Sequence, residues 1–302
     1  DGYFQAARQR GWLEEKTIVA LPEYLGTWLV AAGEKPGMVA APTIAVAMRQ
    51  LVFSHLGAFA REILSASEKQ KVEASLFRLK AAEMARIYQS VFSRLAQAYA
   101  VTLAAGSILL PMPYVENGQV RVGNGPLYNT CVVFRPDGTA DPRPVKKVFP
   151  IASEQPFVKA AAVEEIPVFE TPAGKLGVLI CADSWFPEAI QLMKTLGVEI
   201  LVVPSAVLPG ENWNQPWQGY SGYVEPGDVA PEDIGRLTET QAWDKYALEG
   251  RFACSGAQVG MNIFLYGDLW DLSPCGGRWK MIAGNSMLKS SQDGAALINL
   301  NF

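Results

Sequence analysis

The chain has 302 residues, 49% of them hydrophobic and 19% charged, and its formal net charge is −4. This composition is typical of a globular protein with a sizeable core, and it excludes a disordered chain. No run of Lys and Arg is longer than two residues, which excludes the electrostatic footprint of a nucleic-acid-binding protein. Because no low-complexity linker divides the sequence, we expect residues 1–302 to form a single domain.

Cysteine and histidine are sparse and widely spaced. Cys131, Cys181, Cys254 and Cys275 form no CxxC pair, so their pattern is typical of neither a disulfide framework nor a zinc site. His55 is the only histidine, which argues against a His-rich metal site and limits Cys–His catalysis to this residue. Unpaired cysteines favour a reducing compartment, so we expect a cytoplasmic location.

The first predicted elements are a helix-like start at Asp1, which indicates that the sequence begins inside its fold, and a short apolar strand over residues 17–23. Residues 26–68 follow as an unusually apolar stretch. A membrane span needs about 20 apolar residues, but Pro42 and Arg49 interrupt this stretch. We interpret it as inserted helices that form a buried flap or lid, with a membrane-surface or membrane-embedded element as the alternative.

The following segments alternate between helical and extended patterns. Apolar residues at helical spacing predict a long amphipathic helix over residues 70–99, and a buried strand is predicted over 101–111. A hairpin with its turn at 136–138, two buried strands, an aromatic, Gly- and Pro-rich loop at 208–238, a helix near 242–252 and two late strands come next. This alternation predicts a layered α/β or α+β fold.

One cysteine lies where an apolar run meets an amphipathic run, in GVLICADSWFPEAI. The run up to Ile180 predicts a buried strand, whereas Asp183 and Ser184 are good N-cap residues and Pro187 suits the first turn of a helix. Cys181 would then lie on a strand-to-helix turn, beside backbone N–H groups that lower a thiol pKa and stabilise an oxyanion. The alternative is a small buried side chain without chemistry.

A cysteine nucleophile needs a base and a cation, and with one histidine in the chain a carboxylate and an ammonium are the remaining candidates. LPEYLG places Glu23 at the end of the first predicted strand. VKKVFPIASEQPF supplies Lys146, Lys147 and Glu154. Taken one at a time, a strand-end glutamate and a lysine pair are equally compatible with simple solvation.

Four stretches in this order resemble the nitrilase, or carbon–nitrogen hydrolase, superfamily and its amidase-like branch. LPEY is similar to the segment of the general-base glutamate and gives Glu23. KKVFP is similar to the catalytic-lysine segment, which Lys147 matches better than Lys146, and GVLICADSWFPE resembles the nucleophile segment with Cys181. EILVVPSA resembles the strand that follows the nucleophile. NTCVVFRPDG and GNSMLKSSQDGAALINL also resemble strands and turns of the family.

The resemblance implies a fold and an assembly. It covers about residues 10–300 except for 26–68 and 208–238, and the fold it implies is the four-layer αββα sandwich of carbon–nitrogen hydrolases. Members of the family usually associate through a helical face, so a homodimer or larger homo-oligomer is expected. The insertion at 26–68 directly follows the general-base strand, and we therefore expect it near the mouth of the active-site cleft.

The resemblance also implies a mechanism. Glu23 would deprotonate Cys181, whose thiolate attacks a carbonyl or nitrile carbon, and Lys147 would stabilise the oxyanion together with the backbone N–H of Ala182. A thioester would form and be hydrolysed by water activated by Glu23. Glu154 falls near the family's supporting glutamate and would orient Lys147 or the substrate. This chemistry requires no metal or organic cofactor.

The substrate is less well defined than the mechanism. Residues after the nucleophile usually line the pocket in this family, which makes Ala182, Asp183, Ser184 and Trp185 substrate-binding candidates. CADSWFPE resembles the amidase pattern more than the nitrilase pattern, so we expect hydrolysis of a carboxamide to an acid and ammonia or an amine. Nitrile hydrolysis, acyl transfer from the thioester to an amine, and a catalytically silent binding protein are the alternatives.

Two apolar regions suggest the size of the substrate. The loop at 208–238 contains an aromatic set, and either this set forms a wall of the pocket or the loop packs on itself. The set comprises Trp213, Trp217, Tyr220 and Tyr223. With the apolar insertion, these residues favour a small-molecule amide or nitrile with a bulky or apolar part.

Overall fold

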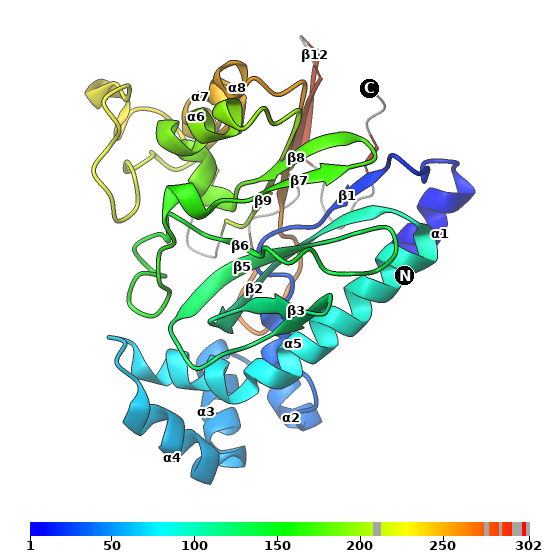
Figure 1. The fold of residues 1–302 in the computed structure, drawn as a ribbon. Coiled ribbons are helices and arrows are strands. Elements are labelled where there is room, and N and C mark those ends of the chain that lie inside the picture. Colours follow the sequence, from blue (N-terminus) through cyan, green and yellow to red (C-terminus); the bar gives the residue numbers. More distant parts are fainter. Residues whose placement is uncertain (208–212, 275–277, 284–285, 292–297, 300–302) are drawn as a thin grey trace.

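Two β-sheets lie at the centre of the computed structural model, which describes residues 1–207, 213–274, 278–283, 286–291 and 298–299 (Figure 1). The first sheet has the strand order β1–β2–β5–β6. β1 pairs parallel with β2, and the other neighbours are antiparallel. Its strands are β1 Ile18–Ala20, β2 Thr102–Pro111, β5 Leu127–Phe134 and β6 Val145–Lys146.

The second sheet has six strands in the order β12–β11–β10–β9–β8–β7. β8, β9 and β10 run parallel to one another, and the outer strands are antiparallel to their neighbours. The strands are β7 Val168–Thr171, β8 Gly174–Val178, β9 Ile200–Ser205, β10 Val259–Phe264, β11 Arg278–Ala283 and β12 Ser286–Ser291. A separate hairpin consists of β3 Tyr114–Glu116 and β4 Gln119–Arg121.

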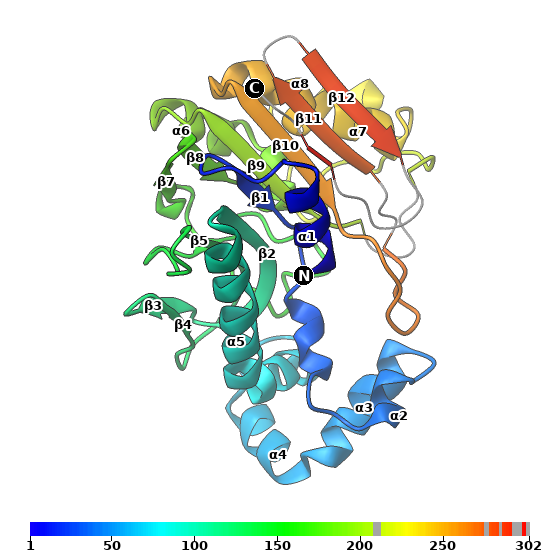
Figure 2. The ribbon, with the colours of Figure 1, turned by 90° about the vertical axis from the view of Figure 1, so that its right-hand side faces the viewer.

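Helices cover the outer faces of both sheets (Figure 1 and Figure 2). On the first sheet these are α1 Gly2–Gln9 and α5 Lys71–Tyr99. On the second sheet they are α6 Pro187–Thr195, α7 Glu239–Tyr246 and α8 Leu248–Ser255. Short 3-10 turns are η2 Val163–Glu165, η3 Cys181–Trp185 and η4 Pro231–Asp233.

Strands β2 and β5 are buried on both faces, which explains the layers. Leu103 and Val132 face α5, whereas Ala104 and Cys131 belong to the core shared with the second sheet. Because successive side chains of a strand point to opposite faces, a strand that is apolar at nearly every position must be covered on both sides. The predicted layered α/β sandwich is confirmed.

Residues 26–68 are helical, as their sequence predicted, and form the lower end of the molecule in Figures 1 and 2. The elements are η1 Thr27–Ala31, α2 Pro36–Val39, α3 Ile44–Ser54 and α4 Leu56–Ser65. They share a small core of their own with Leu76 of α5. Glu34 ties them to α5, since its carboxylate lies 2.7 Å from the Lys80 ammonium and 2.9 Å from His55 Nε2. No helix in the described part of the chain is long and apolar enough to cross a membrane.

A bulge in β2 sets the path of the segment that contains Glu23. The pairing of β2 with β5 shifts register between Ala104 and Ser107, and Gly106 there has a φ of +70°. Ser107 Oγ accepts a hydrogen bond from the Tyr24 N–H at 2.9 Å. A Cβ on Gly106 would lie 2.3 Å from the carbonyl oxygen of Pro22, so only glycine allows the two segments to approach this closely.

We therefore expect Gly106→Ala to lower the free energy of unfolding by about 2–5 kcal/mol, because it adds left-handed strain and a backbone clash. Urea denaturation measures this loss. Gly37→Ala is the control, since Gly37 has ordinary backbone angles and open space around it. Equal stability of the two variants would contradict this explanation of the bulge.

Candidate active site

Three charged side chains meet in a buried cluster between the sheets. Lys147 Nζ lies 2.8 Å from Glu23 Oε1 and 2.6 Å from Glu154 Oε2. All three side chains are almost completely buried. Glu23 follows β1 and Lys147 follows β6, so the ends of two strands of one sheet bring these residues together. Glu154 comes from the adjoining turn, where its Oε2 also accepts the N–H of Ile151 at 2.9 Å.

Strand alternation separates the two neighbouring lysines. Lys147 points into the cluster, whereas the ammonium of Lys146 lies 4.7 Å from the ring centroid of Tyr128 on the other face of β6. The backbone N–H of Lys147 donates to the carbonyl of Asn129 at 2.8 Å, which continues the pairing with β5 beyond the strand. The structure thus assigns the buried position to the lysine that the sequence favoured.

Sequence reasoning missed two residues of this cluster. Asn129 Nδ2 donates to both carboxylates, at 2.9 Å to Glu23 Oε1 and 2.9 Å to Glu154 Oε1. The Tyr24 hydroxyl donates a short hydrogen bond to Glu154 Oε1. Both residues stand inside the stretches that carry the family resemblance, LPEY and NTCVVF. Polar side chains in otherwise buried segments were the available signal.

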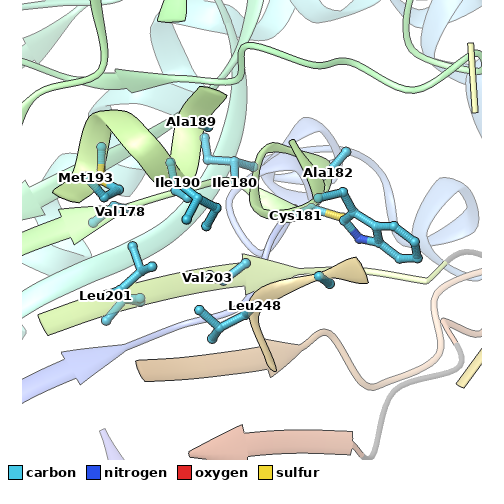
Figure 3. Close-up of a cluster of buried hydrophobic side chains, with 14 of the residues drawn as sticks. Val178, Ile180, Cys181, Ala182, Ala189, Ile190, Met193, Leu201, Val203 and Leu248 are labelled. Atoms are coloured by element: carbon cyan, nitrogen blue, oxygen red, sulfur yellow. The ribbon is translucent and has the colours of Figure 1, made fainter. Parts of the chain in front are cut away.

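Cys181 begins the turn η3 directly after β8 and has a φ of +50°, in the left-handed region. A non-glycine residue held there costs about 1–3 kcal/mol, and such strain is concentrated at functional sites. Its thiol donates to the carbonyl oxygen of Ala206, with an S···O distance of 3.8 Å. Figure 3 shows Cys181 and Ala182 at the edge of the apolar cluster between α6 and β9.

The helix after the nucleophile turn begins later than predicted. Asp183 and Ser184 were expected to cap it, but both lie within η3, and α6 begins at Pro187 with Phe186 as its N-cap. The prediction was wrong because the Asp183 carboxylate reaches back to other backbone groups. The N–H groups beside Cys181 therefore belong to a 3-10 turn rather than to the first turn of α6.

The side chains after Cys181 hold the turn in place. Asp183 Oδ1 accepts the N–H groups of Val148 at 3.0 Å and Phe149 at 2.8 Å, and its Oδ2 accepts that of Ile180 at 3.1 Å. Ser184 Oγ donates to the carbonyl of Cys181 at 2.8 Å. Both side chains are thus occupied by backbone partners. Asp183 connects the lysine segment to the cysteine turn.

Trp185 lies in a buried aromatic cluster with residues of the long loop. Its ring centroid is 5.8 Å from that of Trp217 and 5.6 Å from that of Tyr220, and the Tyr220 hydroxyl donates to its carbonyl at 2.8 Å. Tyr223 contacts Phe186 in the same way, with centroids 5.3 Å apart. This arrangement favours the packing interpretation of the loop aromatics. Residues 208–212 of the predicted loop lie outside the described residues.

Burial and charge act against each other in this cluster. Burial alone would lower the pKa of Lys147, but the two carboxylates outweigh it and raise that pKa well above its ordinary value. For Glu154, burial is likewise outweighed, by Lys147 and by hydrogen bonds from Tyr24 and Asn129, so its pKa is lowered. The stable state therefore has a charged Lys147 and a charged Glu154.

For Glu23 and Cys181 the pKa shifts instead favour the neutral form. Burial, helped by the charge of Glu154, raises the pKa of Glu23, although Lys147 and the thiol of Cys181 oppose the shift. Burial and the charge of Glu23 raise the pKa of Cys181 well above its ordinary value. Within the described part of the chain, Glu23 Oε2 has no hydrogen-bond partner. The site thus combines a neutral thiol with a carboxylate oxygen that is free to accept a proton.

Two further cysteines lie in other elements of the described part of the chain. Cys131 is buried in β5, where burial raises its pKa to about 12, and Cys254 is exposed on α8. Cys275 lies outside the described residues. Among the residues that the structure describes, no group of three or more His, Cys, Asp or Glu side chains has the arrangement of a metal site.

Comparison with known proteins identifies the family of this chain. The family model described as carbon-nitrogen hydrolase matches residues 17–222, which contain Glu23, Lys147, Glu154 and Cys181. The chain belongs to the carbon-nitrogen hydrolase family. The family prediction made from LPEY, KKVFP and GVLICADSWFPE is therefore confirmed.

Curated members of the carbon-nitrogen hydrolase family are similar over part of their length. A probable hydrolase of Bacillus subtilis is 27% identical over 201 residues, which are 65% of this chain and 36% of the relative. An N-carbamoylputrescine amidase of Solanum tuberosum is 28% identical over 44% of this chain and 47% of its own length. An omega-amidase of Xenopus tropicalis is 37% identical over 31% of this chain and 36% of its own. The chain thus spans less than half the length of these relatives.

Solved carbon-nitrogen hydrolase structures share the fold. An amidase from Nesterenkonia superposes with a TM-score of 0.52 and 13% identity, over 97% of this chain and 81% of that one. A carbon-nitrogen hydrolase from Helicobacter pylori gives a TM-score of 0.53 and 20% identity, over 92% and 86%. The layered sandwich is therefore the architecture that these proteins have in common.

The buried carboxyl of Asp183 makes stability depend on pH. Burial, against three backbone N–H donors and Lys147, raises its pKa to about 7. A raised pKa means that the folded state favours the protonated form, so the contribution to stability is lost as pH rises through that value. We expect the unfolding free energy of the wild type, relative to Asp183→Asn, to fall by up to about 4 kcal/mol between about pH 4 and pH 8.

Thermal or urea unfolding of both proteins across this pH range measures the difference. Ser205→Ala is a control for a buried polar side chain without a titrating group. A difference between the wild type and Asp183→Asn that stays constant with pH would show that the hydrogen bonds keep this carboxylate ionised throughout.

Proposed function

We propose that the protein is an amidase that hydrolyses a carboxamide through a thioester on Cys181. The observation that supports this most directly is the buried cluster in which the Lys147 ammonium lies between Glu23 and Glu154, with the neutral thiol of Cys181 close to Glu23. A thiol nucleophile, a carboxylate base and a fixed cation are the groups that acyl transfer from an amide requires.

Glu23 acts as the general base and later as the acid. Its Oε2 accepts the thiol proton while the sulfur of Cys181 attacks the carbonyl carbon. Because the pKa of the thiol is raised, attack and proton transfer must occur together. The same proton then moves from Glu23 to the departing nitrogen as the carbon–nitrogen bond breaks. Ammonia or an amine leaves, and a thioester remains.

Lys147 stabilises the negative oxygen of the tetrahedral intermediate. Its charge is secured by two carboxylates, and its position needs no reorganisation during the reaction. The N–H of Ala182 is the second donor that we assign, because the first N–H groups of the turn η3 have no partner within the turn. Together they supply a cation and a neutral hydrogen-bond donor.

Glu154, Asn129 and Tyr24 act as positioning residues. Glu154 holds the ammonium of Lys147 together with Glu23, while the amide of Asn129 bridges the two carboxylates. Asp183 and Ser184 fix the backbone of the nucleophile turn, and their side chains need not touch the substrate. Water activated by Glu23 then attacks the thioester and releases the acid.

The curated relatives support an amide as the substrate class, because several are named amidases. The resemblance of CADSWFPE to the amidase pattern points the same way. Each half-reaction uses only groups of this chain together with water. An amine in place of water would convert the same thioester into a transferred acyl group.

The proposal predicts a covalent adduct on the nucleophile. Brief exposure of the intact protein to primary carboxamides, followed by acid quench and mass spectrometry, should give an acyl-sized mass increase and release of ammonia. Cys181→Ala should show neither, and Cys254→Ala, which removes the exposed thiol, should behave as the wild type. An adduct that persists in Cys181→Ala would contradict the assignment. Hydroxylamine added to the reaction tests whether the acyl group of the thioester is transferred to an amine or released by water.

Glu23→Gln should lower amide turnover by about 10²- to 10⁴-fold, because it removes the proton acceptor. At the same time it should lower the pKa of Cys181, since the negative charge of Glu23 helps to raise it. The pH dependence of alkylation by iodoacetamide reports this pKa. Exposed Glu164→Gln is the control. A Glu23→Gln variant with normal turnover would remove Glu23 from the mechanism.

A further inference from the structure

An apolar cavity of about 240 Å³ lies between the helical insertion and the rest of the molecule. Five segments line it: 24–51, the first turns of α5, Leu109 of β2, 153–157 and 270–272. The last segment is fastened to the insertion, since Trp270 Nε1 donates to the carbonyl of Met38 at 2.9 Å and Asp271 accepts the N–H of Ile44 at 2.7 Å. The cavity therefore exists only because residues 26–68 pack against the rest of the molecule.

The wall of the cavity offers few free polar groups. Among its described lining residues the polar side chains are few, and several are already paired: Thr27 Oγ1 accepts the N–H of Leu109, and the Tyr24 hydroxyl donates to Glu154. Met48, Leu51 and other apolar or aromatic side chains supply most of the surface. An apolar cavity of about 150 Å³ stays dry and binds benzene. A larger cavity with such a wall suits an apolar ligand better than water.

The cavity and the catalytic cluster share a wall. Glu154 Oε1 accepts from Tyr24 at the cavity, while Oε2 of the same carboxylate holds the ammonium of Lys147 at 2.6 Å. Tyr24 is also the residue next to Glu23, and it packs in one cluster with Ala206, whose carbonyl accepts the thiol of Cys181. A ligand in this cavity would thus contact Tyr24 and Glu154, two side chains of the hydrogen-bond network around Lys147.

We propose that this cavity binds a neutral apolar part of the amide substrate, an aliphatic chain or an aromatic ring, so that the enzyme prefers apolar amides to small polar ones. This inference rests on the proposed function. Burial of apolar surface is the driving force, and each methylene placed in the cavity should improve kcat/KM by about fourfold. The improvement should stop when the cavity is full.

The experiment compares unbranched primary amides from acetamide to decanamide as substrates of the wild type. Ala47 is buried at the cavity wall on α3, and Ala47→Phe fills the cavity. It should lower kcat/KM for octanamide at least tenfold and leave that for acetamide within about twofold. Ala45→Phe, on the exposed side of the same helix, is the matched control and should change neither.

Met48→Ala enlarges the cavity and keeps the test valid even where Ala47→Phe folds poorly. Here the preferred chain length should increase.

Glu73 at the first turn of α5 also lines the cavity, and it would suit a cationic end group instead. A preference for 6-aminohexanamide over hexanamide that is lost in Glu73→Gln would overturn the neutral apolar assignment.

A binding measurement separates this inference from the proposed function. By calorimetry, octanamide should bind Cys181→Ala at least about 100-fold more tightly than acetamide, and Ala47→Phe in that background should remove the difference. This result would support the cavity assignment even if the wild type hydrolysed none of these amides. Failure to hydrolyse them would count against the proposed function alone. Amide hydrolysis with no dependence on chain length, and equal binding of both amides, would overturn the cavity assignment alone.

Discussion

The buried ammonium of Lys147, held between Glu23 and Glu154, is the interaction on which the site depends. A charge taken out of water is stable only when opposite charges and hydrogen bonds replace its solvation, and removing one partner of such a group typically costs about 3–5 kcal/mol. With two carboxylates and one ammonium, the cluster has excess negative charge when all three ionise. Burial and this excess of negative charge together raise the pKa of the Cys181 thiol.

Two residues with strained backbone conformations lie at this cluster. Tyr24 and Cys181 both have positive φ angles, at 61° and 50°, and each is adjacent to or part of the reacting set. Gly106 provides a third left-handed position, at the bulge that receives the Pro22 carbonyl. Strands that are buried on both faces stabilise these conformations, because the surrounding core holds in place the segments that the strained residues connect.

The insertion and the catalytic cluster are connected through one carboxylate. Glu154 binds Lys147 with one oxygen and accepts from Tyr24 with the other, so the group that fixes the cation also forms part of the apolar cavity. Tyr24 and Glu154 therefore belong both to the cavity wall and to the hydrogen-bond network around Lys147. This connection is the physical basis of the proposal that the insertion influences which amides the site accepts.

By itself the sequence determined the layered α/β fold and the helical insertion, because apolar periodicity is a local property. Its resemblance to family motifs also identified the candidate site residues Glu23, Lys147, Glu154 and Cys181, but not Tyr24 or Asn129. Only the tertiary structure decided that Asn129 bridges the two carboxylates, since that contact joins segments more than 100 residues apart. It also decided that Asp183 binds backbone groups of the lysine segment instead of capping α6, because a side chain's best partner depends on what lies beside it in space. The cavity, too, exists only where five segments of the chain meet.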